Sequence, residues 1–323
     1  MSVPHPAAED VRCGREPLVE AIAGFLAHEH AAHLPEIRAL VERAIDEAGT
    51  GAIAGLSDRL SRAGTDWSYY PPDPLVRRIH RELAPHVLRH EPAVFGVEHL
   101  DAVAGLPVVL VANHLSYSDA NAVEVLFQQA GAAELCDRLT VVAGPKVYSS
   151  VTRRFSSLCF GTIKVAQSSG VASEDAVMNA REAARAARRS IDIAHERLAR
   201  GDALLLFPEG SRSRSGQMTR FLPAVSRYLE APEIWIVPLG IAGTERLFPI
   251  ASDALRPVPL TLRVGRPVRA DVLARRAGRS RSLIMDAAGC AVAALLPYEY
   301  RGAYADDSAG LEAARQLSRE LFG

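Results

Sequence analysis

The sequence lacks the features that define several large classes of protein. None of its four cysteines forms a C-x-x-C pair, so neither a zinc site nor a disulfide framework is predicted. A net charge of -1 gives no electrostatic reason to expect a nucleic-acid partner. No apolar run approaches the roughly 18 residues that span a bilayer, and residues 1–16 have no apolar core of signal-peptide length. These absences favour a cytoplasmic protein and leave peripheral contact at the inner membrane surface open.

What is present indicates a globular α/β chain. Of 323 residues 48% are apolar, enough for a substantial core. Apolar residues recur at helical spacing in residues 1–90, which we expect to form a helical N-terminal region. Within it, Trp67 to Pro74 is too rich in proline for regular structure, and we interpret it as a linker. In residues 91–323, apolar strand-like runs alternate with helical segments, which predicts an α/β fold with a mostly parallel central sheet flanked by helices. The predicted strands are Val94–Val97, Val108–Ala112, Leu139–Ala143, Thr162–Ala166, Ala203–Phe207, Ile234–Ile241 and Leu260–Val264.

The first polar cluster follows the predicted strand Val108–Ala112. His114 comes directly after this strand, and Asp119 stands near the start of the next helix. Sites in α/β proteins gather at the carboxyl edge of the sheet, so this placement suits a catalytic pair. A histidine can act as a base near neutral pH, and an aspartate at its other nitrogen would orient the ring. The alternative is structural, with His114 capping the helix and Asp119 as a first-turn acid.

A second cluster follows the strand Ala203–Phe207. Glu209, Gly210, Ser211, Arg212 and Arg214 stand on one short loop, where arginine forks and hydroxyls could hold an anion. A solvated polar loop is the alternative. Lys146 also lies near the end of a predicted strand, Leu139–Ala143.

No metal site is predicted. His28, His30 and His33 lie near one another in the sequence, but they have no acidic or cysteine partner at ligand spacing. We interpret them as a solvated helix face. A phosphoryl-transfer site is also disfavoured, because there is no G-x-x-x-x-G-K-[ST] run and no evident carboxylate pair for Mg²⁺.

Four segments, taken in order, resemble the glycerolipid acyltransferase superfamily over roughly residues 90–270. Asn113-His114-x4-Asp119 resembles its His-x4-Asp catalytic motif, and Phe207 to Ser213 resembles its Glu-Gly-Thr/Ser-Arg-Ser block. Gly161 to Val165 and Ile236 to Leu239 resemble its second block and its proline block. A helical N-terminal region makes the layout most similar to the soluble plastid-type glycerol-3-phosphate acyltransferases.

The resemblance implies an enzyme of phospholipid biosynthesis. It would move a fatty acyl group from acyl-CoA or acyl carrier protein to a hydroxyl of glycerol-3-phosphate or lysophosphatidate, with His114 as general base and Asp119 as its orienting partner. Glu209, Gly210, Ser211, Arg212, Arg214 and Lys146 would form the substrate-binding site, in which Glu209 would organise the loop by pairing with an arginine or by capping backbone amides. Neither a metal nor a bound cofactor is implied, and the expected partners are the thioester donor, the phosphate-bearing acceptor, acyl carrier protein and a membrane surface, but no nucleic acid.

Two alternatives to this reaction remain open. Gln167 stands where the family's second block usually has an arginine, and Ser168 and Ser169 follow where the plastid-type subset has a basic cluster. The same chemistry could therefore act on a non-phosphorylated alcohol or an amine in specialised lipid synthesis. A catalytically silent lipid-binding relative is the other alternative, although such a protein would have no need of both His114 and Asp119.

Overall fold

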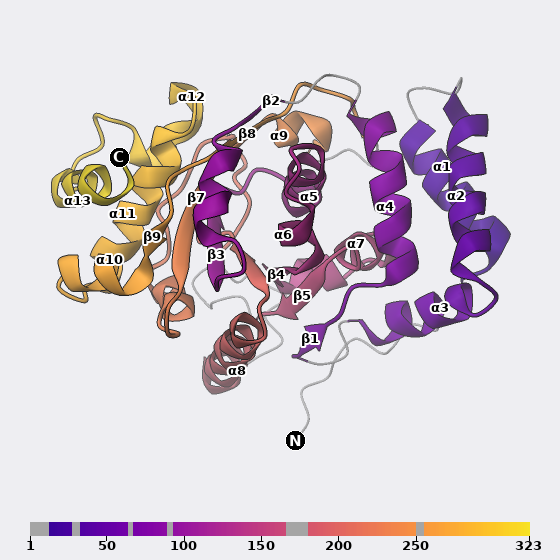
Figure 1. Ribbon diagram of the computed structural model, residues 1–323, viewed down its shortest axis with the longest axis horizontal. Coiled ribbons are helices and arrows are strands. Elements are labelled where there is room, and N and C mark those ends of the chain that lie inside the picture. The colour runs from indigo at the N-terminus through magenta and orange to yellow at the C-terminus, as the bar shows by residue number, and fades with distance from the viewer. Residues whose placement is uncertain (1–12, 28–32, 64–66, 89–92, 166–179, 250–254) are drawn as a thin grey trace. The chain divides into compact units, whose positions relative to one another are not determined.

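The structure is a computed structural model, and it describes residues 13–27, 33–63, 67–88, 93–165, 180–249 and 255–323. The chain divides into two compact units. Figure 1 labels the helices and strands. Unit 1 comprises Met1–Arg89, Val142–Ile193 and Ala251–Pro257, and unit 2 comprises His90–Val141, Ala194–Ile250 and Val258–Gly323. These units differ from the two domains predicted from the sequence, which meet at residue 90. That predicted domain boundary stays a prediction.

Unit 1 contains the helices of the N-terminal region. Helix α2 packs against both α1 and α4, and Ile37, Val41 and Ile45 on α2 are buried. Asp73 caps α4, because its carboxylate accepts the backbone N–H groups of Leu75 and Val76 at 2.9 and 3.1 Å. The elements are α1 (Arg15–Ala27), α2 (Leu34–Ala48), α3 (Ala52–Arg62), β1 (Tyr69–Tyr70), α4 (Pro74–Val87), the 3₁₀ helix η3 (Pro145–Tyr148), α7 (Val151–Ser157) and β5 (Gly161–Lys164).

The interpretation of Trp67 to Pro74 as a segment without regular structure is wrong at its centre. Tyr69 and Tyr70 form the short strand β1, which pairs antiparallel with β5 so that Tyr69 lies opposite Ile163. The strand is held by a partner far along the chain. Local composition, dominated by proline, therefore gave no sign of it.

Unit 2 is built on a sheet in the order β4-β6-β3-β7-β8-β2, with β9 paired to β7. The pairs β4–β6, β6–β3, β3–β7 and β2–β8 are parallel, whereas β7 pairs antiparallel with β8 and β9. This arrangement confirms the predicted α/β fold with a mostly parallel sheet. The strands are β2 (Ala93–Phe95), β3 (Val108–Ala112), β4 (Leu139–Ala143), β6 (Ala203–Leu206), β7 (Trp235–Ala242), β8 (Thr261–Val264) and β9 (Val268–Arg269).

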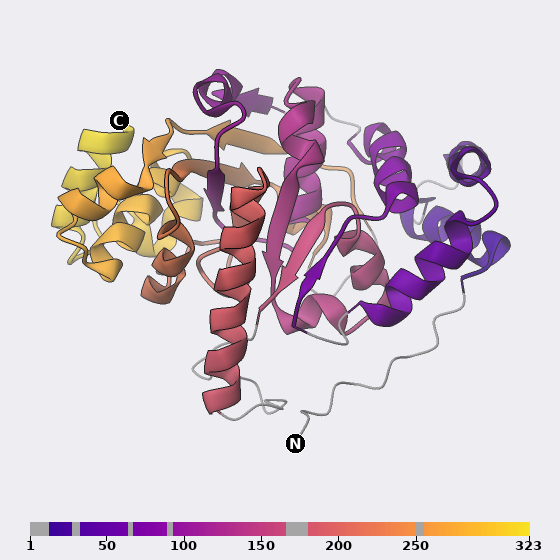
Figure 2. The same ribbon diagram turned by 60° about the horizontal axis from the view of Figure 1, so that its bottom comes forward.

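Helices flank this sheet and bury it. All five residues of β3 are buried, and α11 packs on β7 and β3 while α13 packs on α11. Figure 2 shows the C-terminal helices grouped together. The further elements are η2 (Val97–Val103), α5 (Asp119–Gln129), α6 (Ala133–Asp137), η4 (Pro223–Leu229), α9 (Thr244–Leu247), α10 (Ala270–Arg276), α11 (Arg281–Ala294), α12 (Tyr298–Arg301), η5 (Gly302–Tyr304) and α13 (Glu312–Phe322). Two elements cross the division between the units: β4 ends with two residues of unit 1, and α8 (Ala180–Ala199) begins in unit 1 and ends in unit 2.

The parallel order brings three loops to one edge of the sheet. Strands β6, β3 and β7 are neighbours with matched register, and each ends at this edge. The loops that follow them begin at residues 113, 207 and 243. Polar side chains from distant parts of the sequence therefore meet there. Within the described ranges, no helix is both long and apolar enough to cross a membrane.

Candidate active site

The structure brings His114 and Asp119 together at the end of β3. The ring Nδ1 of His114 lies 2.7 Å from Oδ2 of Asp119. The same carboxylate oxygen accepts the backbone N–H groups of Leu115 and Ser116 at 2.7 and 3.0 Å, and Asp119 is fully buried. The tight loop between strand and helix thus folds around the carboxylate and presents it to the imidazole.

This contact sets the chemistry of the imidazole. Because the carboxylate accepts at Nδ1, that nitrogen carries the proton in the neutral ring and Nε2 keeps its lone pair. The ring also stacks on Phe207, with centroids 4.4 Å apart, and its side chain is 17% exposed. A histidine held in this way can take a proton from a group that approaches Nε2.

The helix-cap alternative for His114 does not describe this structure. The N-cap of α5 is Ser118, and Asp119 is the first residue of the helix. Asp119 therefore does stand in the first turn, as the alternative supposed, but its side chain turns back to the loop and to His114 rather than to solvent.

Glu209 links the second loop to the first. Its Oε1 accepts the backbone N–H of His114 at 2.8 Å, and its Oε2 accepts the backbone N–H and the hydroxyl of Thr219 at 2.7 and 2.9 Å. Burial raises the pKa of this carboxyl group, and the hydrogen bonds from Thr219 and His114 partly offset that effect. In addition, the N–H of Ser213 donates to the backbone oxygen of His114 at 2.7 Å. The two loops are thereby fixed to each other at His114.

The remaining predicted residues of this loop differ in their surroundings. The guanidinium of Arg212 lies 4.2 Å from the ring centroid of Tyr117, so the structure places this arginine against the His114 loop. Gly210, Ser211 and Arg214 are exposed. Gly210 has a φ of +73°, a backbone conformation that glycine adopts without strain.

Lys146 is described in the other unit. It lies in η3 with an exposed side chain, and its backbone oxygen accepts a hydrogen bond from Arg153 at 2.6 Å. The neighbouring Arg154 is buried and donates to the backbone oxygen of Leu60, which gives it a structural role within unit 1. Whether Lys146 reaches the substrate stays a prediction. Gln167, Ser168 and Ser169 fall outside the described residues, as do His28 and His30.

Two residues that hold this site, Asn113 and Thr244, had no role predicted from the sequence. Asn113 donates its side-chain N–H to the oxygen of Ile241 and accepts the N–H of Ile241, at 2.9 and 2.8 Å, which pins the end of β3 to β7. Thr244 donates its hydroxyl to Oδ1 of Asp119 at 2.5 Å. The signal for Asn113 was its place beside His114, whereas Thr244 could be found only from the pairing of β3 with β7.

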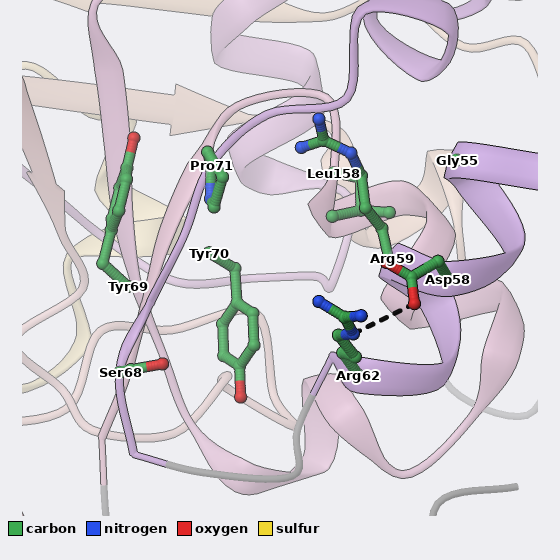
Figure 3. Close-up of a pocket in the computed structure, with 9 residues that line it drawn as sticks. All are labelled: Gly55, Asp58, Arg59, Arg62, Ser68, Tyr69, Tyr70, Pro71 and Leu158. Atoms are coloured by element: carbon green, nitrogen blue, oxygen red, sulfur yellow. Dashed lines mark ion pairs between the residues drawn. The ribbon is translucent and has the colours of Figure 1, made fainter. Parts of the chain in front are cut away.

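Two further observations concern ligand sites elsewhere. A hollow of about 500 Å³ lies in unit 1, and its lining includes Arg59 and Arg62 of α3 together with Ser68 and Tyr70 (Figure 3). It contains none of the predicted site residues, and Arg62 is paired there with Asp58 at 3.0 Å. In the part of the chain that the structure describes, no group of three or more His, Cys, Asp or Glu side chains could hold a metal ion.

Comparison with known proteins gives three findings. Residues 92–242 match the family model described as Acyltransferase. Over 69 residues the chain is 32% identical to a 1-acyl-sn-glycerol-3-phosphate acyltransferase from Limnanthes douglasii, and in a second alignment of 69 residues it is 30% identical to one from Cocos nucifera. Each alignment covers 21% of this chain, and the chain spans only 25% and 22% of the length of those two relatives.

The third finding is a solved structure. The 1-acyl-sn-glycerophosphate (LPA) acyltransferase PlsC from Thermotoga maritima aligns with 80% of this chain and 88% of its own, at 17% sequence identity and a TM-score of 0.43.

Proposed function

Because residues 92–242 belong to the glycerolipid acyltransferase superfamily, we propose that this protein transfers a fatty acyl group from a thioester to a hydroxyl group. The observation that carries the proposal is the buried contact of Asp119 with His114 Nδ1, which leaves Nε2 as the basic nitrogen. The acyl donor is acyl-CoA or acyl carrier protein. The acceptor is a phosphate-bearing glycerol, lysophosphatidate or glycerol-3-phosphate, and the names of the two curated relatives support the former.

In the proposed reaction, Nε2 of His114 removes the proton of the acceptor hydroxyl. The oxygen then forms a bond to the thioester carbonyl carbon, the carbon–sulfur bond breaks, and the thiolate leaving group takes the proton from His114. Asp119 orients the ring and stabilises the imidazolium between these two transfers. General base catalysis of this kind typically contributes about 10²- to 10⁴-fold. No acyl-enzyme and no bound cofactor are proposed.

The acceptor's phosphate is assigned to the loop that carries Arg212 and Arg214. A guanidinium can pair with phosphate through two parallel hydrogen bonds. The contact between Arg212 and Tyr117 supports this assignment, since Tyr117 stands between His114 and Asp119 in the sequence. An anion held at Arg212 would therefore lie beside the other loop, which carries the proposed base His114. Ser211 and Arg214 are exposed residues of the same loop as Arg212.

The test is a donor-by-acceptor matrix on the purified full chain. Acyl-CoA and acyl carrier protein are each offered glycerol-3-phosphate, lysophosphatidate or a neutral alcohol, and acceptor-dependent thiol release is measured with product mass. We expect release with a phosphate-bearing acceptor. If only the neutral alcohol is acylated, the phosphate assignment is wrong; if no acceptor stimulates release, the proposed reaction is wrong.

The role of His114 is tested with a matched pair of variants. His114→Ala should keep the wild-type melting temperature within a few degrees and lose nearly all transfer. His195→Ala is the control, because His195 is a half-buried histidine of the same unit whose Nε2 lies 3.0 Å from the backbone oxygen of Arg227. It should retain wild-type transfer. Near wild-type activity in His114→Ala would rule out the base.

A further inference from the structure

Thr244 makes a buried hydrogen bond to the aspartate of the catalytic pair. Its hydroxyl donates to Oδ1 of Asp119 at 2.5 Å, and both residues are fully buried. The other oxygen, Oδ2, meets His114 and the backbone N–H groups of Leu115 and Ser116. Both oxygens of the carboxylate are therefore held, one by its own loop and one by Thr244.

The fold delivers Thr244 to this position from another strand. Strand β7 pairs with β3 so that Leu239 lies opposite Ala112, and β7 then continues to Ala242 beyond the end of β3. Gly243 turns the chain with a φ of +100°, and a Cβ at this position would lie 2.5 Å from the backbone oxygen of Pro259. Only glycine fits this turn, which places Thr244 at the start of α9 against Asp119.

A second set of contacts, made by Glu245, holds the turn at Gly243. The carboxylate of Glu245 accepts the backbone N–H of Gly243 at 3.2 Å and the phenol hydroxyl of Tyr300 at 2.8 Å. Tyr300 belongs to α12, in the C-terminal part of the chain beyond the residues that match the family model. The position of Thr244 therefore depends on contacts made by the C-terminal segment.

We propose that Thr244 is a positioning residue for acyl transfer, holding the Asp119 carboxylate in the rotation at which Oδ2 meets His114 Nδ1. The inference rests on the proposed function. The terminal torsion of an aspartate has no sharp intrinsic preference, so its partners must fix it. Without the hydroxyl of Thr244, Oδ1 would be a buried acceptor with no donor at this position, and the carboxylate would rotate or shift to find one. His114 would then lose its alignment with the acceptor.

The experiment compares Thr244→Val, which keeps the shape but removes the hydroxyl, with Thr244→Ser, which keeps the hydroxyl. With the acceptor and donor found in the matrix, Thr244→Val should lower kcat about 10- to 100-fold, the scale of a misplaced catalytic group, and leave both KM values within about twofold. Thr244→Ser should restore kcat to within about threefold of wild type. A purely structural role would lower melting temperature without this split between kcat and KM.

The chain offers a matched control in Thr140. Its hydroxyl donates to Oδ2 of Asp202 at 2.5 Å, and both residues are buried. This bond lies near the amino ends of β4 and β6, at the edge of the sheet opposite to His114. Thr140→Val removes a buried threonine–aspartate bond of the same length, but both oxygens of Asp202 also accept from Arg197, at 2.8 and 2.7 Å. This variant should therefore lower the melting temperature no more than Thr244→Val does and leave kcat at the wild-type value.

The inference is wrong if Thr244→Val has wild-type kcat, or if Thr140→Val lowers kcat equally. Failure of the proposed function would look different, since the wild type itself would then acylate no acceptor. In that case the positioning role of Thr244 can still be tested by the ¹H–¹⁵N signal of the His114 Nδ1–H, which is assigned by its loss in His114→Ala. Thr244→Val should shift or broaden this signal and Thr244→Ser should keep it; an unchanged signal in Thr244→Val would overturn the positioning role.

Discussion

The carboxylate of Glu209 accepts the backbone N–H of His114 at 2.8 Å. Glu209 follows β6 and His114 follows β3, so this one bond joins the two polar loops at the residue proposed as the base. The other oxygen of Glu209 accepts two hydrogen bonds from Thr219, which lies farther along the second loop. That part of the loop is therefore also held at Glu209. Glu209 therefore acts on protein groups, and its hydrogen bonds fix the backbone from which the imidazole projects.

Glu209→Gln should destabilise the protein and slow transfer. A carboxamide has one accepting oxygen, so either the N–H of His114 or that of Thr219 would face an NH₂ group inside the protein. We expect a loss of about 1–3 kcal/mol in the free energy of unfolding, the cost of one buried unsatisfied group, measured by urea titration. Glu230→Gln is the control, because Glu230 pairs with Arg281 on the surface and should matter little. Equal stability of the two variants would contradict this account.

The sequence predicted much of this site because its signals are local. Strand β3 lies at the predicted residues, since a run of β-branched residues is a direct strand signal, and the spacing of His114 and Asp119 placed both on one loop. Thr219 and Thr244 carry no such signal. They reach the site through a loop that folds back and through the pairing of β7 with β3. Contacts of this kind depend on sheet order, which the sequence alone left undetermined.

Tyr117→Leu should weaken binding of an anionic acceptor. The ring of Tyr117 lies under the guanidinium of Arg212 at 4.2 Å, and such a cation–π contact is worth about 0.5–1 kcal/mol at a partly exposed site. Its loss should raise the acceptor KM about 2- to 5-fold and leave the donor KM unchanged, whereas Tyr117→Phe keeps an aromatic ring under Arg212 and should raise the acceptor KM less. Phe95→Leu removes the comparable stack under Arg263, at 4.4 Å, and serves as the control. A parallel rise in the donor KM would argue against the anion assignment.

Gly243→Ala should destabilise the protein far more than the same substitution at a glycine with free space around it, such as Gly131. Gly243 and Gly131 both have positive φ, at +100° and +85°. A Cβ at Gly243 would meet the backbone oxygen of Pro259 at 2.5 Å, whereas nothing lies within 4 Å of one at Gly131. Gly131→Ala should therefore cost about 1–2 kcal/mol for its backbone alone. Gly243→Ala should cost several times more by urea unfolding, because the turn that carries Thr244 must move. Similar losses in the two variants would mean that the turn adapts.

The raised pKa of Tyr300 predicts how the stability of the protein changes at alkaline pH. Partial burial and the hydrogen bond to Glu245 raise the pKa of Tyr300 from 10.0 to about 12. Between these two values the tyrosine of the unfolded chain has lost its proton while that of the folded chain keeps it. Its contribution to stability is thus complete below pH 10 and is lost as the pH rises through 12. Removing the hydroxyl should remove this dependence.

The measurement is urea unfolding of the wild type and Tyr300→Phe at intervals from pH 7 to pH 12. Near neutral pH the wild type should be more stable by about 1 kcal/mol, the typical value of one hydrogen bond. The difference should shrink steadily above pH 10, while Tyr304, whose pKa is also raised by burial, contributes equally to both proteins. Tyr298→Phe is the control, since Tyr298 is on the same helix and 60% exposed, and it should follow the wild type at every pH. A difference between wild type and Tyr300→Phe that stays constant to pH 12 would show that the bond to Glu245 does not hold the phenol proton. In that case the turn that carries Thr244 would lose its proposed support from α12.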